Sequence, residues 1–152
     1  MKKVLTFALA VMLVMSLSVT AFAANTTGGE ADITTSIAPT YTVTIPADVN
    51  VQFNATETAF GAIEVTASQI HPDKCIKVAL ATDKELNNAI DNTKVIPYAI
   101  KDSEGAEFTS ATYLTEGDKT ELSIHITADD WNAAYAGEYS DTVTFTVSYE
   151  DQ

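Results

Sequence analysis

The side chains that could form a catalytic pair in this 152-residue sequence are His71 and Cys75. They are four residues apart with Asp73 between them, and a cysteine close to a histidine is the pairing from which cysteine nucleophiles are built. His71, however, precedes Pro72 in a predicted turn, whereas Cys75 begins a predicted strand. No helix then brings the two side chains together, so the spacing does not favour a Cys–His pair.

Other catalytic and metal-binding patterns are missing from the sequence. It has no serine in a Gly-x-Ser-x-Gly turn, no cysteine or histidine cluster with zinc spacing, and no glycine-rich loop before a helix. His125 lies between Ile124 and Ile126 in an alternating stretch and is predicted to point away from the core. We therefore expect a protein that is not an enzyme and that holds no cofactor or metal.

Two groups of side chains could bind a ligand instead. The carboxylates of Asp102–Glu107 could offer oxygens to calcium, but the run lacks the twelve-residue loop pattern, and a solvated hairpin tip is the simpler interpretation. Sugar binding by a β-protein would need an exposed aromatic platform. Its candidates are Trp131, Tyr135, Tyr113 and Tyr98, although a single tryptophan near a corner more often packs than binds.

The stretch that must organise the rest of the chain is the predicted last strand, Gly137–Tyr149. From Tyr139 its odd positions are mostly apolar or aromatic and its even positions carry only serine and threonine, which is the period of a half-buried strand. Val143, Phe145 and Val147 are expected to face a core, with the threonines facing water. Other strands must cover this apolar face, so the pattern predicts packed sheets.

Turn signals separate further alternating segments along the chain. Their spacing predicts one all-β, immunoglobulin-like antiparallel β-sandwich of about seven to nine strands. Asp83–Asn92 and Ala128–Ala134 are predicted to be short helical connectors, and Lys101–Gly105 and Thr115–Asp118 to be hairpin turns. The earlier strands are predicted at Ala31–Ile37, Tyr41–Ile45, Val49–Phe53, Gly61–Ala67, Ile76–Leu80, Tyr98–Ile100, Phe108–Leu114 and Leu122–Ile126.

The beginning of the chain has the pattern of a secretory signal peptide. A short basic start is followed by an apolar run from Val4 to Val19 and by the small-x-small sequence of Ala21–Ala23. This divides the chain into a signal peptide at 1–23, a flexible arm at 24–29 and the sandwich domain at 30–152. The mature protein is expected to be secreted or on the cell surface, without stable insertion into a membrane.

Net charge and cysteine content exclude some classes of partner and some kinds of disulfide. The net charge is −13, and it becomes about −15 once Lys2 and Lys3 leave with the signal peptide. Such a surface repels nucleic acid and anionic membranes, so neither is expected as a partner. Cys75 is the only cysteine, which excludes an internal disulfide. An intermolecular disulfide and a merely tolerated small residue both stay open.

The approach to the last strand is the most distinctive local pattern. Trp131 is predicted to close one end of the sandwich, and Ala-Gly-x-Tyr places Tyr139 as a corner tyrosine whose hydroxyl reaches back to the preceding loop. Together with Tyr41–Ala47, this stretch resembles small secreted immunoglobulin-like proteins of Gram-positive gut bacteria. Gly137–Tyr149 is also similar to the terminal strand of spore-coat U type pilin domains, although their disulfide cysteines are missing. The resemblance implies a cell-surface or matrix protein.

Two kinds of function are compatible with these patterns. One is a structural or adhesive surface protein that assembles with itself, and the other is a soluble module that binds a polysaccharide or a host glycan. Threonine-rich strand faces and the N-terminal arm favour the first. Glu30–Ile37 is predicted to be a loosely held edge strand that pairs within its own domain or with a neighbouring copy. Pairing within the domain is favoured because a complete sandwich is the commoner arrangement.

Overall fold

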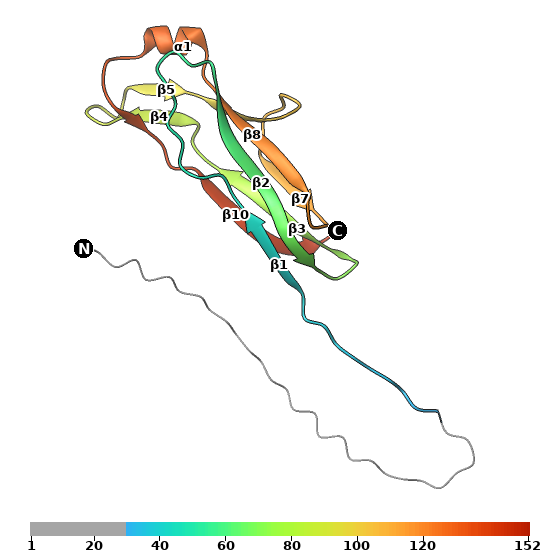
Figure 1. The fold of residues 1–152 in the computed structure, drawn as a ribbon. Helices are drawn as coiled ribbons and strands as arrows, with labels where there is room; N and C mark the ends of the chain where they lie inside the picture. The colour runs from blue at the N-terminus through green and yellow to red at the C-terminus, as the bar shows by residue number, and fades with distance from the viewer. Residues whose placement is uncertain (1–29) are drawn as a thin grey trace, which may run out of the picture. The chain divides into compact units, whose positions relative to one another are not determined.

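The computed structural model describes residues 30–152, of which Ser36–Gln152 form one compact unit. The predicted signal peptide and the arm at 24–29 lie outside the described residues. The regular secondary structure of the unit is almost entirely β, as predicted, with ten strands and one short helix in these residues (Figure 1). The elements are β1 (Thr40–Thr44), β2 (Glu57–Gln69), β3 (Lys74–Ala81), β4 (Glu85–Asn88), β5 (Val95–Pro97), β6 (Ala99–Asp102), β7 (Ser110–Tyr113), β8 (Lys119–His125), α1 (Ala128–Ala133), β9 (Tyr139–Ser140) and β10 (Thr144–Asp151).

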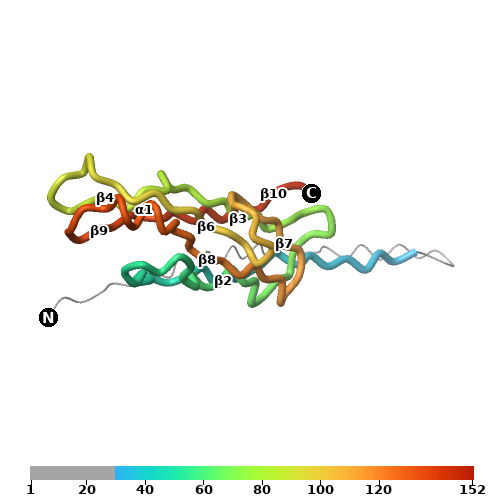
Figure 2. Tube along the Cα trace, turned by 90° about the horizontal axis from the view of Figure 1, so that it is seen from above, coloured from blue at the N-terminus to red at the C-terminus, as the bar shows by residue number. Residues whose placement is uncertain are grey.

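All strand pairs are antiparallel, and they form three sheets. The largest has the order β1-β2-β8-β6, and a second has the order β10-β3-β7. Figure 2 shows β2 and β8 in one layer and β3 and β10 in the other. A small third sheet, β5-β4-β9, extends the molecule beyond these two layers. The prediction of an antiparallel sandwich is confirmed.

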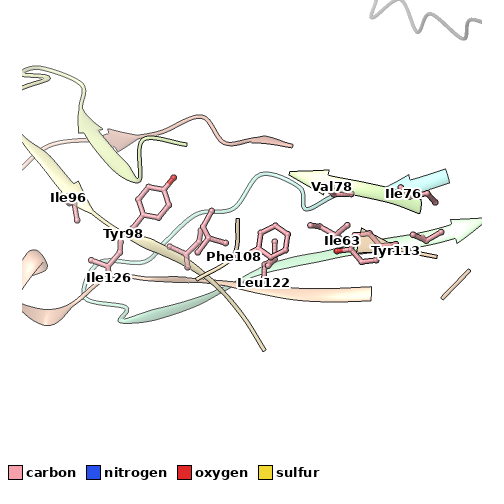
Figure 3. Close-up of a cluster of buried hydrophobic side chains, with 12 residues drawn as sticks. Ile63, Ile76, Val78, Ile96, Tyr98, Phe108, Tyr113, Leu122 and Ile126 are labelled. Carbon is pink, nitrogen blue, oxygen red and sulfur yellow. The ribbon is translucent and has the colours of Figure 1, made fainter. Parts of the chain in front are cut away.

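The core lies between the two larger sheets. Ile63 of β2 lies opposite Ile76 and Val78 of β3 (Figure 3), and these three residues are fully buried, as is Val65 of β2. Alternate residues of each strand point inward, which is why the period of two in the sequence predicted these strands. Burial of each such side chain contributes about 1.5–3 kcal/mol, so the contact between these sheets is a large source of apolar stabilisation.

Several local predictions are confirmed. Helix α1 occupies nearly the predicted range and is capped at its start by Thr127, whose Oγ1 accepts a hydrogen bond from the backbone N–H of Asp130 at 3.1 Å. The Tyr139 hydroxyl donates to the carbonyl of Tyr135 at 2.9 Å, as expected of a corner tyrosine. The predicted turns close through backbone bonds, for example from the Gly105 N–H to the Asp102 carbonyl at 3.0 Å.

The predicted helix at Asp83–Asn92 is wrong. This stretch contains β4 and the turn that leads into β5, and both sides of β4 are paired with neighbouring strands. Asn88 ends the strand because its Oδ1 accepts hydrogen bonds from the N–H groups of Ile90 and Asp91, which would otherwise have no partner in the turn. Ile90 follows Leu86 by four residues, which is the spacing of neighbours on one face of a helix, but Ile90 is 90% exposed.

Two predicted strands near the N-terminus are also wrong. Val49–Phe53 and Ala31–Ile37 have no strand pairing. Val51 still packs partly against the core, whereas Phe53 is 75% exposed and contacts Trp131 edge to face, with 5.6 Å between ring centroids. Pro46 follows β1 closely, and a proline cannot donate to a strand ladder, so the chain continues past it without pairing.

The predicted last strand is divided between two sheets. Residues 139–140 form β9 and pair with β4, whereas β10 begins at Thr144 and pairs with β3. The chain changes sheet at Asp141, whose Oδ2 accepts hydrogen bonds from the hydroxyls of Tyr98 and Thr82. The sequence pattern cannot show this switch because the same alternation continues through it.

None of the helices in residues 30–152 has the length and the apolar character needed to cross a membrane.

Candidate functional site

The feature with the clearest potential for function is the free side of β10. This eight-residue strand pairs with β3 in an uninterrupted register from Thr144 opposite Ala81 to Asp151 opposite Lys74. No strand within residues 30–152 pairs with its other side, so β10 is the edge of its sheet (Figure 1). A row of backbone N–H and C=O groups is therefore open to another strand. We call this side of the strand the β10 edge.

The composition of β10 does not protect this edge. Natural edge strands are commonly blocked by lysine, proline, a bulge or short length. β10 has no lysine, no proline and no register shift, and Thr144–Tyr149 carries no charge. These six residues are β-branched or aromatic except for Ser148, which is a composition that favours strand pairing.

The two acidic residues at the end of β10 are neutralised from β3. Glu150 pairs with Lys77, with 3.2 Å between Oε2 and Nζ, and Asp151 pairs with Lys74. Hydrogen bonds from Ser148 and then Lys77 lower the pKa of the Glu150 carboxyl from its usual value. These pairs are exposed and contribute little stability, but they keep the acidity of the protein away from the β10 edge.

The other edge strands are short or blocked. β1 has five residues, lies between Pro39 and Pro46, and has a register shift after Thr42. β7 has four residues. On the outer side of β6, the chain itself supplies partners, because the Phe108 N–H donates to the Ile100 carbonyl at 2.9 Å. β5 and β9 have three and two residues. β10 is thus the longest open edge among the described strands.

Apolar side chains that are half-buried or exposed lie between the β1 and β10 sides of the sandwich. The Tyr41 and Tyr149 rings stack with 5.7 Å between centroids, and Phe60 of β2 contacts Phe145 at 6.0 Å. Val147 remains 38% exposed and Ile45 44% exposed, so this side of the core is not fully covered. We call these residues the edge seam, and define it as Tyr41, Val43, Ile45, Phe145, Val147 and Tyr149.

The predicted burial of the inward face of the last strand is only partly correct. Val143, Phe145 and Val147 were expected to face a closed core, but Val143 and Phe145 are half-buried and Val147 is exposed. Thr144 and Thr146 are exposed, as predicted. The strand has the expected faces, but its inward face is covered incompletely because it lies at the edge of the sheet.

The segment Glu30–Ile37 has no strand pairing in the structure. All its side chains are exposed, including Ile33 at 98% and Ile37 at 62%. Pairing of this segment within its own domain stays a prediction, because residues 30–35 lie outside the compact unit Ser36–Gln152. The segment has the alternation of a strand at Ala31, Ile33, Thr35 and Ile37, but it forms no strand in the structure.

Two of the four candidate ligand-binding aromatics are core residues. Tyr98 is 8% exposed and donates to Asp141, and Tyr113 is 3% exposed and donates to Thr120 Oγ1 at 2.8 Å. Burial raises the pKa of both phenols. Neither ring can offer a face to a sugar, so this part of the predicted platform is wrong.

The other two aromatics lie near the end of the molecule that carries α1. The Trp131 Nε1–H donates to the Ala55 carbonyl at 2.8 Å, and the half-buried ring packs against the core, which closes that end as predicted. Tyr135 is 63% exposed, and the Lys94 ammonium lies 4.9 Å from its ring centroid. The four candidates do not form one platform.

The remaining candidate residues have structural roles. Asp102 Oδ1 accepts hydrogen bonds from the N–H groups of Glu104 and Ala106 at 2.9 and 3.0 Å, which fixes the hairpin tip. Cys75 is buried, and its thiol lies 3.7 Å from the Asp151 carbonyl. The backbone N–H of His71 donates to the Tyr149 hydroxyl. Within residues 30–152, no group of three or more His, Cys, Asp or Glu side chains could hold a metal.

Comparison with known proteins gives limited information. No protein-family model matches the chain, and no curated protein matches it. Among solved structures, the chain is similar to one described as "Chaperone-tip adhesin complex is vital for synergistic activation of CFA/I fimbriae biogenesis", with 10% identity and a TM-score of 0.48. The match covers 74% of this chain and 43% of that one, so this chain spans less than half of its length.

Proposed function

We propose that this chain is a secreted, non-catalytic structural or adhesive protein of the cell surface whose copies assemble by strand pairing. The β10 edge of one copy accepts the segment Glu30–Ile37 of another. The observation that carries the proposal is the β10 edge itself, which is eight residues long, regular, uncharged over six residues and without any of the usual blocking features.

The pattern of the N-terminal segment suits this edge. Glu30–Ile37 has eight residues, which is also the length of β10, and its apolar residues alternate. Once the segment is added beside β10, one of its faces turns toward the edge seam. Ile33 and Ile37 then leave water, and burial of each side chain contributes about 1.5–3 kcal/mol. Val147 and Ile45 become covered in the same step.

The local sequence opposes pairing of the segment with its own domain. To run back along β1 and reach the β10 edge of the same copy, the chain would have to reverse at Ala38-Pro39. Two-residue hairpin turns need positive φ at their first or at both central residues. Proline fixes φ near −65°, and alanine rarely adopts positive φ, so this turn is disfavoured. Pairing between copies avoids the turn.

Export and surface location rest on the predicted signal peptide. The acidic net charge suits a solvated extracellular protein and keeps separate copies soluble through mutual repulsion. Assembly then depends on a neutral contact surface, and the β10 edge is neutral because Lys74 and Lys77 pair with its two acids.

The test is removal of the segment. A mature protein that begins at Pro39 should stay folded, because the compact unit and its buried core are retained, but should lose self-association. Sedimentation velocity and negative-stain imaging of the full mature chain and the truncated chain measure the difference. Equal oligomer size in the two proteins would contradict the proposal.

A peptide experiment separates strand addition from other effects of truncation. The peptide Glu30–Ala38 should bind the truncated protein and protect amides of β10 from hydrogen exchange. The matched control is the same peptide with Ile33→Ser and Ile37→Ser, which keeps the length and charge but removes the apolar face. If both peptides bind equally, the edge seam does not recognise the segment.

A further inference from the structure

A second surface lies away from the β10 edge, where the β4–β5 hairpin approaches the loop after α1 (Figure 1). It is an open pocket of about 250 Å³. Its lining combines an aromatic ring, an amide, a carboxylate and an ammonium group within one small area. The lining residues are Asn88, Ile90, Asp91, Lys94, Tyr135 and Ala136.

Asn88 is the group in this pocket that points to a ligand. Its side chain is 6% exposed, and Oδ1 accepts hydrogen bonds from the N–H groups of Ile90 and Asp91 at 2.9 and 3.2 Å. Its Nδ2 donates no hydrogen bond within residues 30–152. Every described side-chain polar atom that is cut off from solvent has a partner, so Nδ2 must keep contact with solvent. A nearly buried amide thus presents an unused donor at the pocket.

Gly137 leaves the space that this amide occupies. A Cβ atom at position 137 would lie 2.4 Å from Asn88 Nδ2, which is closer than any real contact, and the φ angle of +154° is one that side chains disfavour. A side chain at position 137 would force the Asn88 amide to move, so the observed position of this amide depends on the glycine.

The neighbouring polar groups also have unused capacity. Asp91 Oδ1 accepts from the N–H and the hydroxyl of Thr93, whereas Oδ2 accepts nothing from the described residues. Lys94 lies over the Tyr135 ring and forms no ion pair with a residue in the described range. Tyr135 stays 63% exposed despite this contact, so much of its aromatic surface is open.

We propose that this pocket binds a neutral pyranose sugar, as a site separate from the proposed assembly edge. A pyranose has one apolar C–H face, which suits the Tyr135 ring, and adjacent hydroxyls that both donate and accept hydrogen bonds. Asn88 Nδ2 and Lys94 Nζ supply donors, and Asp91 Oδ2 supplies an acceptor. The charges of Lys94 and Asp91 cancel, and the rest of the protein is strongly acidic, so a neutral sugar is favoured over an anionic one.

The test is an NMR titration of the full mature protein labelled with ¹⁵N. The probes are the methyl pyranosides of glucose, galactose, mannose and N-acetylglucosamine, with methyl glucuronide as the anionic comparison. At least one neutral probe should move the Asn88 side-chain amide signals and the Tyr135 backbone signal in a saturable way. Absence of a saturable shift with every neutral probe, or a shift with the glucuronide alone, would overturn the proposal.

Three variants locate the site. Tyr135→Ala should weaken binding roughly tenfold, because the stacking surface is lost while the Tyr135 carbonyl that accepts from Tyr139 remains. Asn88→Asp keeps the oxygen that ends β4 but removes the donor, and should weaken binding by a similar factor. Phe53→Ala is the control, because it removes another exposed aromatic that does not line the pocket. Equal affinity in Tyr135→Ala and Phe53→Ala would show that the sugar does not bind against the Tyr135 ring and would overturn the assignment of this pocket.

Discussion

The two lateral sides of the sandwich are closed in different ways. On the β6 side, residues 106–109 bridge the sheets: the Phe108 N–H donates to the Ile100 carbonyl at 2.9 Å, and the Leu80 N–H of β3 donates to the Thr109 carbonyl at 2.8 Å. On the β10 side, the two sheets meet through side chains alone among the described residues, as in the Tyr41–Tyr149 stack. Backbone bonding completes the first side, whereas the second keeps an unpaired strand beside an apolar seam.

The two sides are therefore expected to have different roles, one in the stability of the domain and the other in assembly. The bridged side uses its backbone groups internally, so it stabilises the domain and offers little to a partner. The open side has half-buried apolar residues and free backbone groups, so it stabilises the domain less and gains more when another strand is added. The predictions below test this comparison, from the largest expected effect to the smallest.

The largest effect is expected from truncation of core side chains on the two sides. Ile100→Ala on the bridged side should lower the free energy of unfolding by about 4 kcal/mol, because Ile100 is 1% exposed and the site cannot relax easily. Phe145→Ala in the edge seam should cost only about 2 kcal/mol, because this half-buried ring already contacts solvent. Urea denaturation of the truncated protein that begins at Pro39 gives both values without interference from assembly.

Thr144→Ala is the matched surface control for this measurement. Its side chain is exposed, so the expected change is below about 0.5 kcal/mol. If Phe145→Ala costs as much as Ile100→Ala, the β10 side is closed as firmly as the β6 side, and the contrast between them does not hold.

A smaller effect is expected from lysine at the two edges of one sheet. The sheet β10-β3-β7 has an exposed threonine at each edge, Thr146 on β10 and Thr112 on β7. Thr146→Lys should weaken self-association of the full mature chain roughly tenfold, or about 1.4 kcal/mol, because a lysine on an edge strand opposes pairing. Sedimentation velocity over a range of concentrations measures the change.

Thr112→Lys controls for the added charge. Both variants change the net charge by the same amount, and β7 has four residues, so this variant should associate as the unchanged protein does. Equal weakening in the two variants would mean that net charge, rather than the β10 edge, governs association.

Much of the fold could be predicted from the sequence because alternation is a local property. The cores of β2, β3 and β8 and the corner at Tyr139 follow from residue types at fixed spacing. The position of a strand within its sheet does not follow, because the partners of β10 lie as far away as Lys74–Ala81. The alternation of the last strand therefore predicted its two faces, but not that β10 lies at the edge of a sheet.

The local sequence also does not show which candidate site residues are exposed. Tyr98 and Tyr135 are equally plausible sugar-binding residues in the sequence, but one is buried beside Asp141 and the other is exposed beside Lys94. Asn88 was missed because it lay in a stretch with apparent helical spacing. The only local signal was the density of asparagine and aspartate at Asn87–Asn92, which is typical of turns rather than helices.

The smallest expected effect concerns the point where the chain leaves β9 for β10. Tyr98 and Thr82 both donate hydrogen bonds to Asp141 there. These bonds attach the segment just before β10 to the rest of the domain. Tyr98→Phe should lower the free energy of unfolding by about 1 kcal/mol, because one hydrogen bond is lost while Thr82 and the Thr142 N–H still satisfy the carboxylate.

The pH dependence of the free energy of unfolding distinguishes the contribution of Tyr98 from that of its neighbours. Burial and the hydrogen bond to Asp141 raise the pKa of Tyr98 above its usual value of 10.0. Below about pH 10 both the folded and the unfolded states keep the phenol proton, so the contribution of Tyr98 is constant there. As the pH rises above 10, the unfolded state loses the proton first, and stability falls. Tyr113 contributes to this fall in both proteins, because burial also raises its pKa. The Tyr98→Phe protein should therefore lose less stability than the unchanged protein between about pH 9 and 11, as measured by urea denaturation of the truncated chain. Parallel pH profiles would show that Tyr98 is not held as a protonated donor to Asp141, and that the start of β10 is fixed by other contacts.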